Sequence, residues 1–264
     1  MIAHDISDGI ATITLDSPST RNALPMAGWQ ALARAVAAVG AAVGTAVGTE
    51  VGAARPRAVV LRAASAGMFC SGSDLREIAA LADDAARRAP FRQAMRDALE
   101  PLARLPMPVI AVIDGDCFGA GVALALAADL RVAGPRAVFA IPPAKLGITY
   151  PQEDIARLVA LVGPGQAGRL LYAAARIDAA QAARIGLVEV VAQDALAEAM
   201  ELASTMAALS PASLAALKHA VARVPLGHDP GLDAAFDEAF AGADFREGLA
   251  AFGERRPARF GDAL

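Results

Sequence analysis

The chain has 264 residues, of which 56% are hydrophobic and only 5% aromatic, and its formal net charge is −4. This apolar content excludes disorder over most of the chain, because disordered chains are poor in apolar residues and rich in net charge. The sequence has no basic block, which argues against nucleic acid as a partner, and its longest uncharged stretch, 202–217, is too short and too polar for a membrane span.

Strands and helices alternate along the first 200 residues. Apolar and β-branched runs predict strands at 10–15, 58–61, 109–113, 131–132 and 137–141. Helices are predicted from Pro25 to Val39, at 83–105, at 120–130 and from 154 onward, interrupted by a short strand at 186–191. The low-complexity segment 40–54 predicts a loop or a helix extension without chemistry. The fold class is therefore α/β (α+β), with a helical tail that begins near Ser210-Pro211.

The cysteines and the N-terminus indicate the compartment. Cys70 and Cys117 are isolated and lack metal-ligand spacing, so we expect two buried thiols and no metal site. Asp5 and Asp8 stand near the N-terminus, and no Lys or Arg precedes Arg21, which is unlike a signal peptide. We expect a cytoplasmic protein with no membrane partner.

Three glycine-bearing turns follow apolar strands, at 69–74, 115–121 and 145–150. Glycine permits unusual backbone angles and a close approach of the backbone to a ligand. The second turn leads directly into a helix, whose free amides are able to bind an oxyanion or phosphate. A dinucleotide fingerprint is absent, because Leu124 stands where its third glycine belongs. Taken singly, each turn is better explained as an ordinary tight turn with close helix packing.

The order and spacing of these segments resemble the enoyl-CoA hydratase/isomerase (crotonase) superfamily. Phe69-Cys70-Ser71-Gly72-Ser73-Asp74-Leu75 is similar to its F-x-A-G-x-D-L segment. Pro106–Ala111, Gly115 and Gly119-Ala120-Gly121 are similar to its K-P-x-I-A…N-G…G-G-G segment. Further pieces in family order are Arg21–Leu24, Asp129–Arg131, Phe139, Leu146-Gly147, Ile185–Val188 and Glu247–Pro257. The resemblance covers about residues 5–260.

This resemblance implies a spiral of ββα units in residues 1–205 and a helical trimerisation region in 206–264, with trimers often paired into hexamers. It implies acyl-CoA thioesters as substrates and no cofactor, since CoA enters as part of the substrate. The thioester oxygen would be held by the amides of Ser73 and Ala120 as an enolate forms. The implied substrate-binding and CoA-binding residues are Arg21, Ala23, Ser71, Gly72, Asp74, Leu75, Gly119, Pro142, Pro143 and Leu146, with Arg255 or Arg256 reaching the phosphates bound by a neighbouring subunit.

The sequence departs from the family at both hydratase glutamates. The matching positions hold Ala123 and Pro143, neither of which is able to transfer a proton. Tyr150 is the leading substitute, because its loop is similar to that of methylmalonyl-CoA decarboxylases; the alternative is a loop-edge ring with a solvated hydroxyl. Glu153 and Asp154 are better explained as acids in a first helical turn.

We therefore expect an acyl-CoA-binding enzyme of the lyase or isomerase class that stabilises a thioester enolate without the two-glutamate water chemistry. One alternative is a decarboxylase-like enzyme that uses Tyr150. The other is a catalytically silent acyl-CoA-binding protein. Asp74 and Glu77 are expected to act at a helix start rather than in catalysis.

Overall fold

The computed structural model describes residues 1–44, 55–223 and 227–261. At the N-terminus, β1 (Ile2–Ser7) and β2 (Ile10–Leu15) form an antiparallel hairpin. A short 3₁₀ helix (Pro18–Thr20) and the long helix α1 (Met26–Gly44) follow. The predicted strand at 10–15 is confirmed, and the helix predicted from Pro25 begins one residue later.

From β3 onward the chain repeats a unit of two strands followed by helix, and each unit contributes one strand to each of two sheets. The first strands are β3 (Ala58–Ala63), β5 (Val109–Ile113) and β7 (Leu130–Ala133), in a six-stranded sheet ordered β1-β2-β3-β5-β7-β10. The second strands are β4 (Gly67–Cys70), β6 (Gly115–Phe118) and β8 (Val138–Ala140), in a four-stranded sheet ordered β4-β6-β8-β9. All neighbours among these six strands run parallel.

The helices that close these units are α2 (Leu75–Ala80) and α3 (Ala85–Ala103), then α4 (Ala120–Leu126), then a 3₁₀ helix (Pro143–Leu146) and α5 (Gln152–Tyr172). The chain continues through β9 (Ile177–Asp178), α6 (Ala179–Arg184), β10 (Val190–Val191) and α7 (Ala195–Ala207). This alternation confirms the predicted mixed α/β class.

Two apolar clusters stabilise the fold. The larger one is formed by the inner sheet faces and by α1, α3, α4 and α5, and includes Trp29, Phe69 and Phe139. The smaller one lies where α7 covers the other face of the six-stranded sheet, through Ala195, Ala199 and Ala203. The small alanine side chains let α7 lie close to the valine and isoleucine side chains of β3 and β5.

By length and composition alone, Met26–Val43 of α1 is apolar enough to cross a membrane. In the fold, however, α1 packs on α3 and the N-terminal strands, and Trp29, Leu32, Val36 and Val39 are buried in the larger cluster. The apolar residues of α1 are therefore explained by packing of one helix face against the core.

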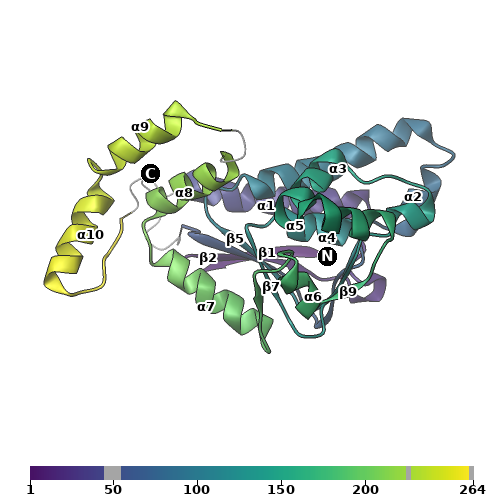
Figure 1. Ribbon diagram of the computed structural model, residues 1–264, viewed down its shortest axis with the longest axis horizontal. Coiled ribbons are helices and arrows are strands. Elements are labelled where there is room, and N and C mark those ends of the chain that lie inside the picture. The colour runs from purple at the N-terminus through teal and green to yellow at the C-terminus, as the bar shows by residue number, and fades with distance from the viewer. Residues whose placement is uncertain (45–54, 224–226, 262–264) are drawn as a thin grey trace.

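The last three helices, α8 (Pro211–Arg223), α9 (Pro230–Ala239) and α10 (Ala243–Glu254), extend away from the sheets on the side opposite α2 (Figure 1). In the described part of these helices only Ala251 is buried. Large apolar side chains are instead exposed, among them Phe236, Phe240 and Phe252. The helix boundary predicted at Ser210-Pro211 is confirmed.

Several sequence predictions are corrected. The helix predicted at 120–130 ends at Leu126, and Leu130 begins β7, where it pairs with Ile110. β1, β4, β6 and β9 were not predicted; β4, β6 and β9 have four residues or fewer, which leaves hardly any period to detect. Of the low-complexity segment, 40–44 extends α1, and 45–54 lies outside the described residues.

Candidate active site

The turn after β4 is held by the segment that follows β2. The Leu24 amide donates to the Gly72 carbonyl (2.8 Å), and the Asp74 amide donates to the Leu24 carbonyl (3.1 Å). Arg21 and Asn22 adopt left-handed backbone angles, and the buried Asn22 side chain accepts from the Ser17 amide (2.7 Å) and donates to the Phe69 carbonyl (3.0 Å). Asn22 therefore fixes this corner, a role that the sequence analysis did not assign to it.

The turn after β6 leads directly into α4. Gly119 has φ 52° and ψ −123°, and its amide donates to the Ala140 carbonyl (2.9 Å) of β8. Gly121 lies against the end of β4, where an added Cβ would come within 2.3 Å of the Cys70 carbonyl oxygen. Glycine is required at 121 because α4 begins in contact with the backbone of the neighbouring strand.

These two turns place the Ala120 amide beside the Gly72–Ser73 segment. Gly72 has φ 103°, and a Cβ added there would lie 3.1 Å from the Ala120 nitrogen and 2.9 Å from the Phe118 carbonyl oxygen. Within residues 1–44, 55–223 and 227–261, neither amide donates a hydrogen bond to another protein group. Two adjacent backbone donors without an acceptor are suited to bind an oxyanion.

Beside this pair lies a pocket of about 650 Å³, which is within the usual range for small-molecule sites. Eight predicted site residues line it, namely Arg21, Ala23, Ser71, Ser73, Asp74, Leu75, Pro142 and Leu146. Gly72, Gly119, Ala120, Pro143 and Tyr150 are not among its lining residues, although Gly72, Gly119 and Ala120 form the turns next to it. Residues of all three glycine-bearing turns therefore lie at or next to this pocket.

Four cationic side chains line the pocket, Arg21, Arg76, Lys145 and Arg176. Arg21 pairs with Asp116 (2.9 Å), and the Arg176 guanidinium lies over the Phe118 ring, 5.0 Å from its centroid. Arg176 was missed by the sequence analysis, because it precedes β9 and reaches the site only through the pairing of β9 with β8. This positive lining attracts an anionic ligand.

Asp74 and Glu77 act at helix starts, as predicted. Asp74 accepts from the amides of Arg76 (2.8 Å) and Glu77 (3.2 Å) at the start of α2. Glu77 accepts from the Met26 amide (2.6 Å) and so caps α1. Both carboxylates therefore have structural partners.

Arg255 and Arg256 lie at the end of α10 and do not line the pocket. Arg256 is paired with Glu247 (2.5 Å) and Glu254 (2.6 Å), and its guanidinium lowers the pKa of Glu247 to about 2. Arg255 is exposed in the left-handed position that ends the helix.

Tyr150 is buried, which contradicts the alternative of a solvated loop-edge hydroxyl. Its hydroxyl donates to the Gly119 carbonyl oxygen (3.0 Å). Burial and then the charge of Asp154 raise its pKa well above the ordinary range, while a hydrogen bond from the Ala123 backbone acts in the opposite direction. Ala123 itself is fully buried on α4, and Pro143 opens the 3₁₀ helix after β8. Neither of these last two positions carries an ionisable group.

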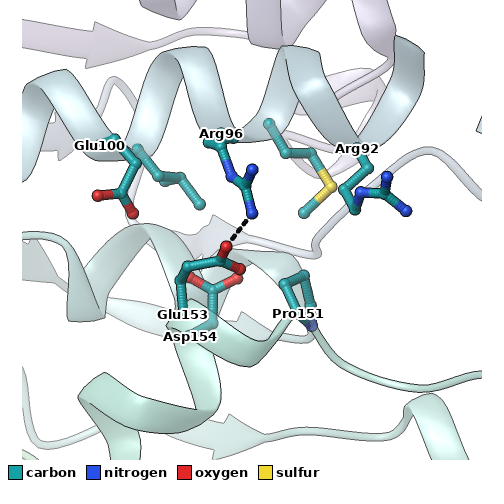
Figure 2. A pocket seen from close by; sticks show the side chains of 8 residues that line it. Arg92, Arg96, Glu100, Pro151, Glu153 and Asp154 are labelled. Carbon is teal, nitrogen blue, oxygen red and sulfur yellow. Dashed lines mark hydrogen bonds and ion pairs between the residues drawn. The ribbon is translucent and has the colours of Figure 1, made fainter. Parts of the chain in front are cut away.

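A second, water-sized cavity of about 20 Å³ lies between α3 and α5 (Figure 2). Glu153 forms an ion pair with Arg96 across it, and hydrogen bonding to its own amide lowers the pKa of this carboxyl. Asp154 is a buried carboxyl that accepts from Arg157 (3.2 Å), and burial raises its pKa to about 6. Both acids lie in the first turn of α5, as expected, but the burial of Asp154 was not predicted.

The described residues contain no cluster of three or more His, Cys, Asp or Glu side chains that could hold a metal ion. Cys70 and Cys117 are free, buried and opposite each other on β4 and β6. Burial raises the pKa of the Cys70 thiol to about 12, so it remains protonated and unreactive at neutral pH.

Comparison with known proteins identifies this arrangement. The family model described as enoyl-CoA hydratase/isomerase matches residues 5–263. The chain belongs to the enoyl-CoA hydratase/isomerase family. The curated enoyl-CoA isomerase/hydratase fer4 of Mycosarcoma maydis is 32% identical over 94% of this chain and 91% of its own length. Two crystal structures also match, an enoyl-CoA hydratase/carnithine racemase of Magnetospirillum magneticum (TM-score 0.88, 30% identity, 99% of this chain and 95% of that one) and an enoyl-CoA hydratase of Bacillus anthracis (TM-score 0.86, 29% identity, 98% of each chain).

These matches confirm the resemblance read from the glycine-bearing turns and the crotonase-type fold with its helical C-terminal region. They identify the chain as an acyl-CoA-related enzyme of the enoyl-CoA hydratase/isomerase family.

Proposed function

We propose that this enoyl-CoA hydratase/isomerase family member binds an acyl-CoA thioester in the 650 Å³ pocket and stabilises its enolate on the amides of Ser73 and Ala120. The observation that carries the proposal is the pair of adjacent amides without an intramolecular acceptor. Loss of one such preorganised donor typically costs ~3–4 kcal/mol of transition-state stabilisation. Because the donors belong to the backbone, alanine at 120 in place of the family's usual glycine still supplies an amide donor.

The CoA moiety supplies the anionic groups that the pocket is built to attract. Arg21, Arg76, Lys145 and Arg176 line the pocket and would meet its phosphates. Arginine and lysine bind phosphate oxygens through charge-assisted hydrogen bonds. The reaction as proposed needs no cofactor beyond the CoA of the substrate. We also propose that the protein is cytoplasmic.

Hydration of an enoyl-CoA is not the activity that this site supports best. Hydration needs a base to activate water and an acid to deliver the α-proton, and Ala123 and Pro143 provide neither. Groups that act as a unit lose most of their activity when any member is absent. The site supports a reaction in which the enolate arises by another route, such as cleavage of a carbon–carbon bond.

If the carbon–carbon bond is cleaved by decarboxylation, an acid must protonate the resulting enolate. Tyr150 is a weak candidate for this acid. Its hydroxyl proton is already donated to the Gly119 carbonyl, and its raised pKa makes it a poorer acid than a solvated tyrosine. After loss of CO₂, the thioester enolate would take its proton from water or from another group to give the product.

We further propose that α8–α10 pack against neighbouring subunits in a trimer, or in a dimer of trimers. The exposed Phe236, Phe240 and Phe245 support this assembly, because their rings contact one another and exposed apolar clusters are typical of subunit contacts. Phe252 of the same region is also exposed.

A panel of CoA thioesters tests the proposed function. Calorimetry and turnover are measured with crotonyl-CoA, 3-hydroxybutyryl-CoA, malonyl-CoA and methylmalonyl-CoA. We expect binding of the panel, turnover of a carboxylated thioester and very slow hydration of crotonyl-CoA. Efficient crotonyl-CoA hydration would show that the acid–base groups lie elsewhere, and binding without any turnover would identify a silent acyl-CoA-binding protein.

A further inference from the structure

We propose that Tyr150 is a positioning residue, which orients and polarises the peptide unit between Gly119 and Ala120. The inference rests on the proposed function, because the amide of that peptide unit is one of the two proposed enolate donors. It assigns the buried hydroxyl to the binding of the thioester oxygen rather than to proton delivery.

The Tyr150 hydroxyl is connected to the Ala120 amide through the Gly119 carbonyl group. The carbonyl oxygen of Gly119 and the amide of Ala120 belong to one planar peptide, so they point in opposite directions from it. The carbonyl accepts from the Val122 amide (2.9 Å), from Tyr150 Oη (3.0 Å) and more weakly from the Ala123 amide (3.4 Å). The first and last of these donors belong to α4 itself, so Tyr150 is the donor that comes from another element.

An additional restraint is useful at this peptide because Gly119 is conformationally free. Its φ of 52° and ψ of −123° lie in a region that residues with a side chain rarely adopt, and a glycine can leave it at little cost. Tyr150 holds the carbonyl end of the peptide, which restrains the amide end beside the Gly72–Ser73 segment. A hydrogen bond to the carbonyl also polarises the peptide and strengthens its amide as a donor, by about 10–30% per bond.

The surroundings of Tyr150 keep its proton on the hydroxyl. Asp154 faces the phenol from α5, Cys70 and Cys117 face it from β4 and β6, and the Ala123 amide faces it from α4. The nearby carboxylate and the burial of the ring both disfavour a phenolate. Tyr150 therefore donates to Gly119 throughout the pH range in which the protein would work, and its effect is independent of pH there.

The test uses acetyl-CoA labelled with ¹³C at the thioester carbonyl, whose stretching frequency falls when its oxygen accepts hydrogen bonds. We expect a lowered frequency on binding to the wild-type protein. The variant Tyr150→Phe should bind with an affinity within about threefold of wild type. It should lose at least about 5–15% of the frequency shift at every pH between about 6 and 9, because one of the two amide donors is weakened by about 10–30%. Tyr172→Phe is the matched control, because Tyr172 is 85% exposed on α5 and should leave the shift unchanged.

A second measurement tests the same proposal in case the Tyr150→Phe variant folds poorly. The chain has only two tyrosines, so fluorotyrosine incorporated in the Tyr172→Phe background labels position 150 alone. The more acidic phenol is a stronger donor and should increase the frequency shift. An unchanged shift in both Tyr150→Phe and the fluorotyrosine protein would overturn the positioning role, whereas no shift in the wild-type protein would overturn the proposed enolate site instead.

Discussion

The buried carboxyl of Asp154 makes the stability of this protein depend on pH in a direction opposite to that of most carboxylates. Burial raises its pKa from the ordinary 3.8 to about 6, although Arg157 partly offsets this. Between these values the unfolded chain has lost the proton and the folded chain retains it, so the free energy of unfolding falls as pH rises. Each pH unit corresponds to ~1.4 kcal/mol, so the full penalty at neutral pH is about 3 kcal/mol.

The substitution Asp154→Asn removes this penalty. We expect the variant to be more stable than wild type at about pH 8, and its advantage should shrink by about 2 kcal/mol when the pH is lowered to about 4.5. Arg157 does not become unpaired in the variant, because it also bonds to Glu100 (2.5 Å). Urea denaturation of both proteins at a series of pH values, followed by circular dichroism, gives the difference in free energy directly.

Glu153→Gln is the matched control on the same helix turn. The Glu153 carboxyl is more exposed and its pKa is lowered, so its contribution to stability is present above its unfolded pKa and is lost as pH falls. The control variant should therefore be less stable than wild type at neutral pH, with a difference that shrinks toward acid. A stability difference for Asp154→Asn that does not change with pH would refute the assignment of a desolvated carboxyl to this position.

Three further predictions follow from the site, the core and the tail. Gly72→Ala should reduce turnover of any reactive CoA thioester at least ~100-fold by crowding the Ala120 amide. Gly67→Ala is the control, because Gly67 has a similar φ but open space around it; this variant should lose about 1–3 kcal/mol of stability and keep its turnover. Arg131→Met should lower the free energy of unfolding by about 3 kcal/mol in urea denaturation, because it leaves the buried carbonyls of Leu187 and Ala128 without their donor and removes the ion pair with Glu189. A loss below ~1 kcal/mol would contradict this. Light scattering should give three or six times the 26.8 kDa of one chain, and Phe252→Glu should shift it toward the monomer; a monomeric wild type would refute the assembly.

The sequence alone determined the features that depend on residue type and local order. Alternating apolar residues marked β2, and Pro25 and Ser210-Pro211 marked the starts of α1 and α8 within one residue. The three glycine-bearing turns and the apolar residues Ala123 and Pro143 were also read directly from it. These features need no tertiary contact, because backbone preference and side-chain chemistry reside in the residues themselves.

The tertiary structure decided which of these residues meet. The amides of Ser73 and Ala120 are 47 residues apart in sequence, and only the parallel pairing of β4 with β6 brings their turns together. The same pairing is invisible in strands of four residues that contain glycine. Tyr150 and Asp154 showed no local signal of burial; their environment comes from the packing of the Tyr150 loop and α5 on α4 and α3. Hydrogen bonds, pKa values and strand pairing depend on neighbours that are distant along the chain. Residue types therefore identified candidates for this site, but only the tertiary structure showed which of them lie close together.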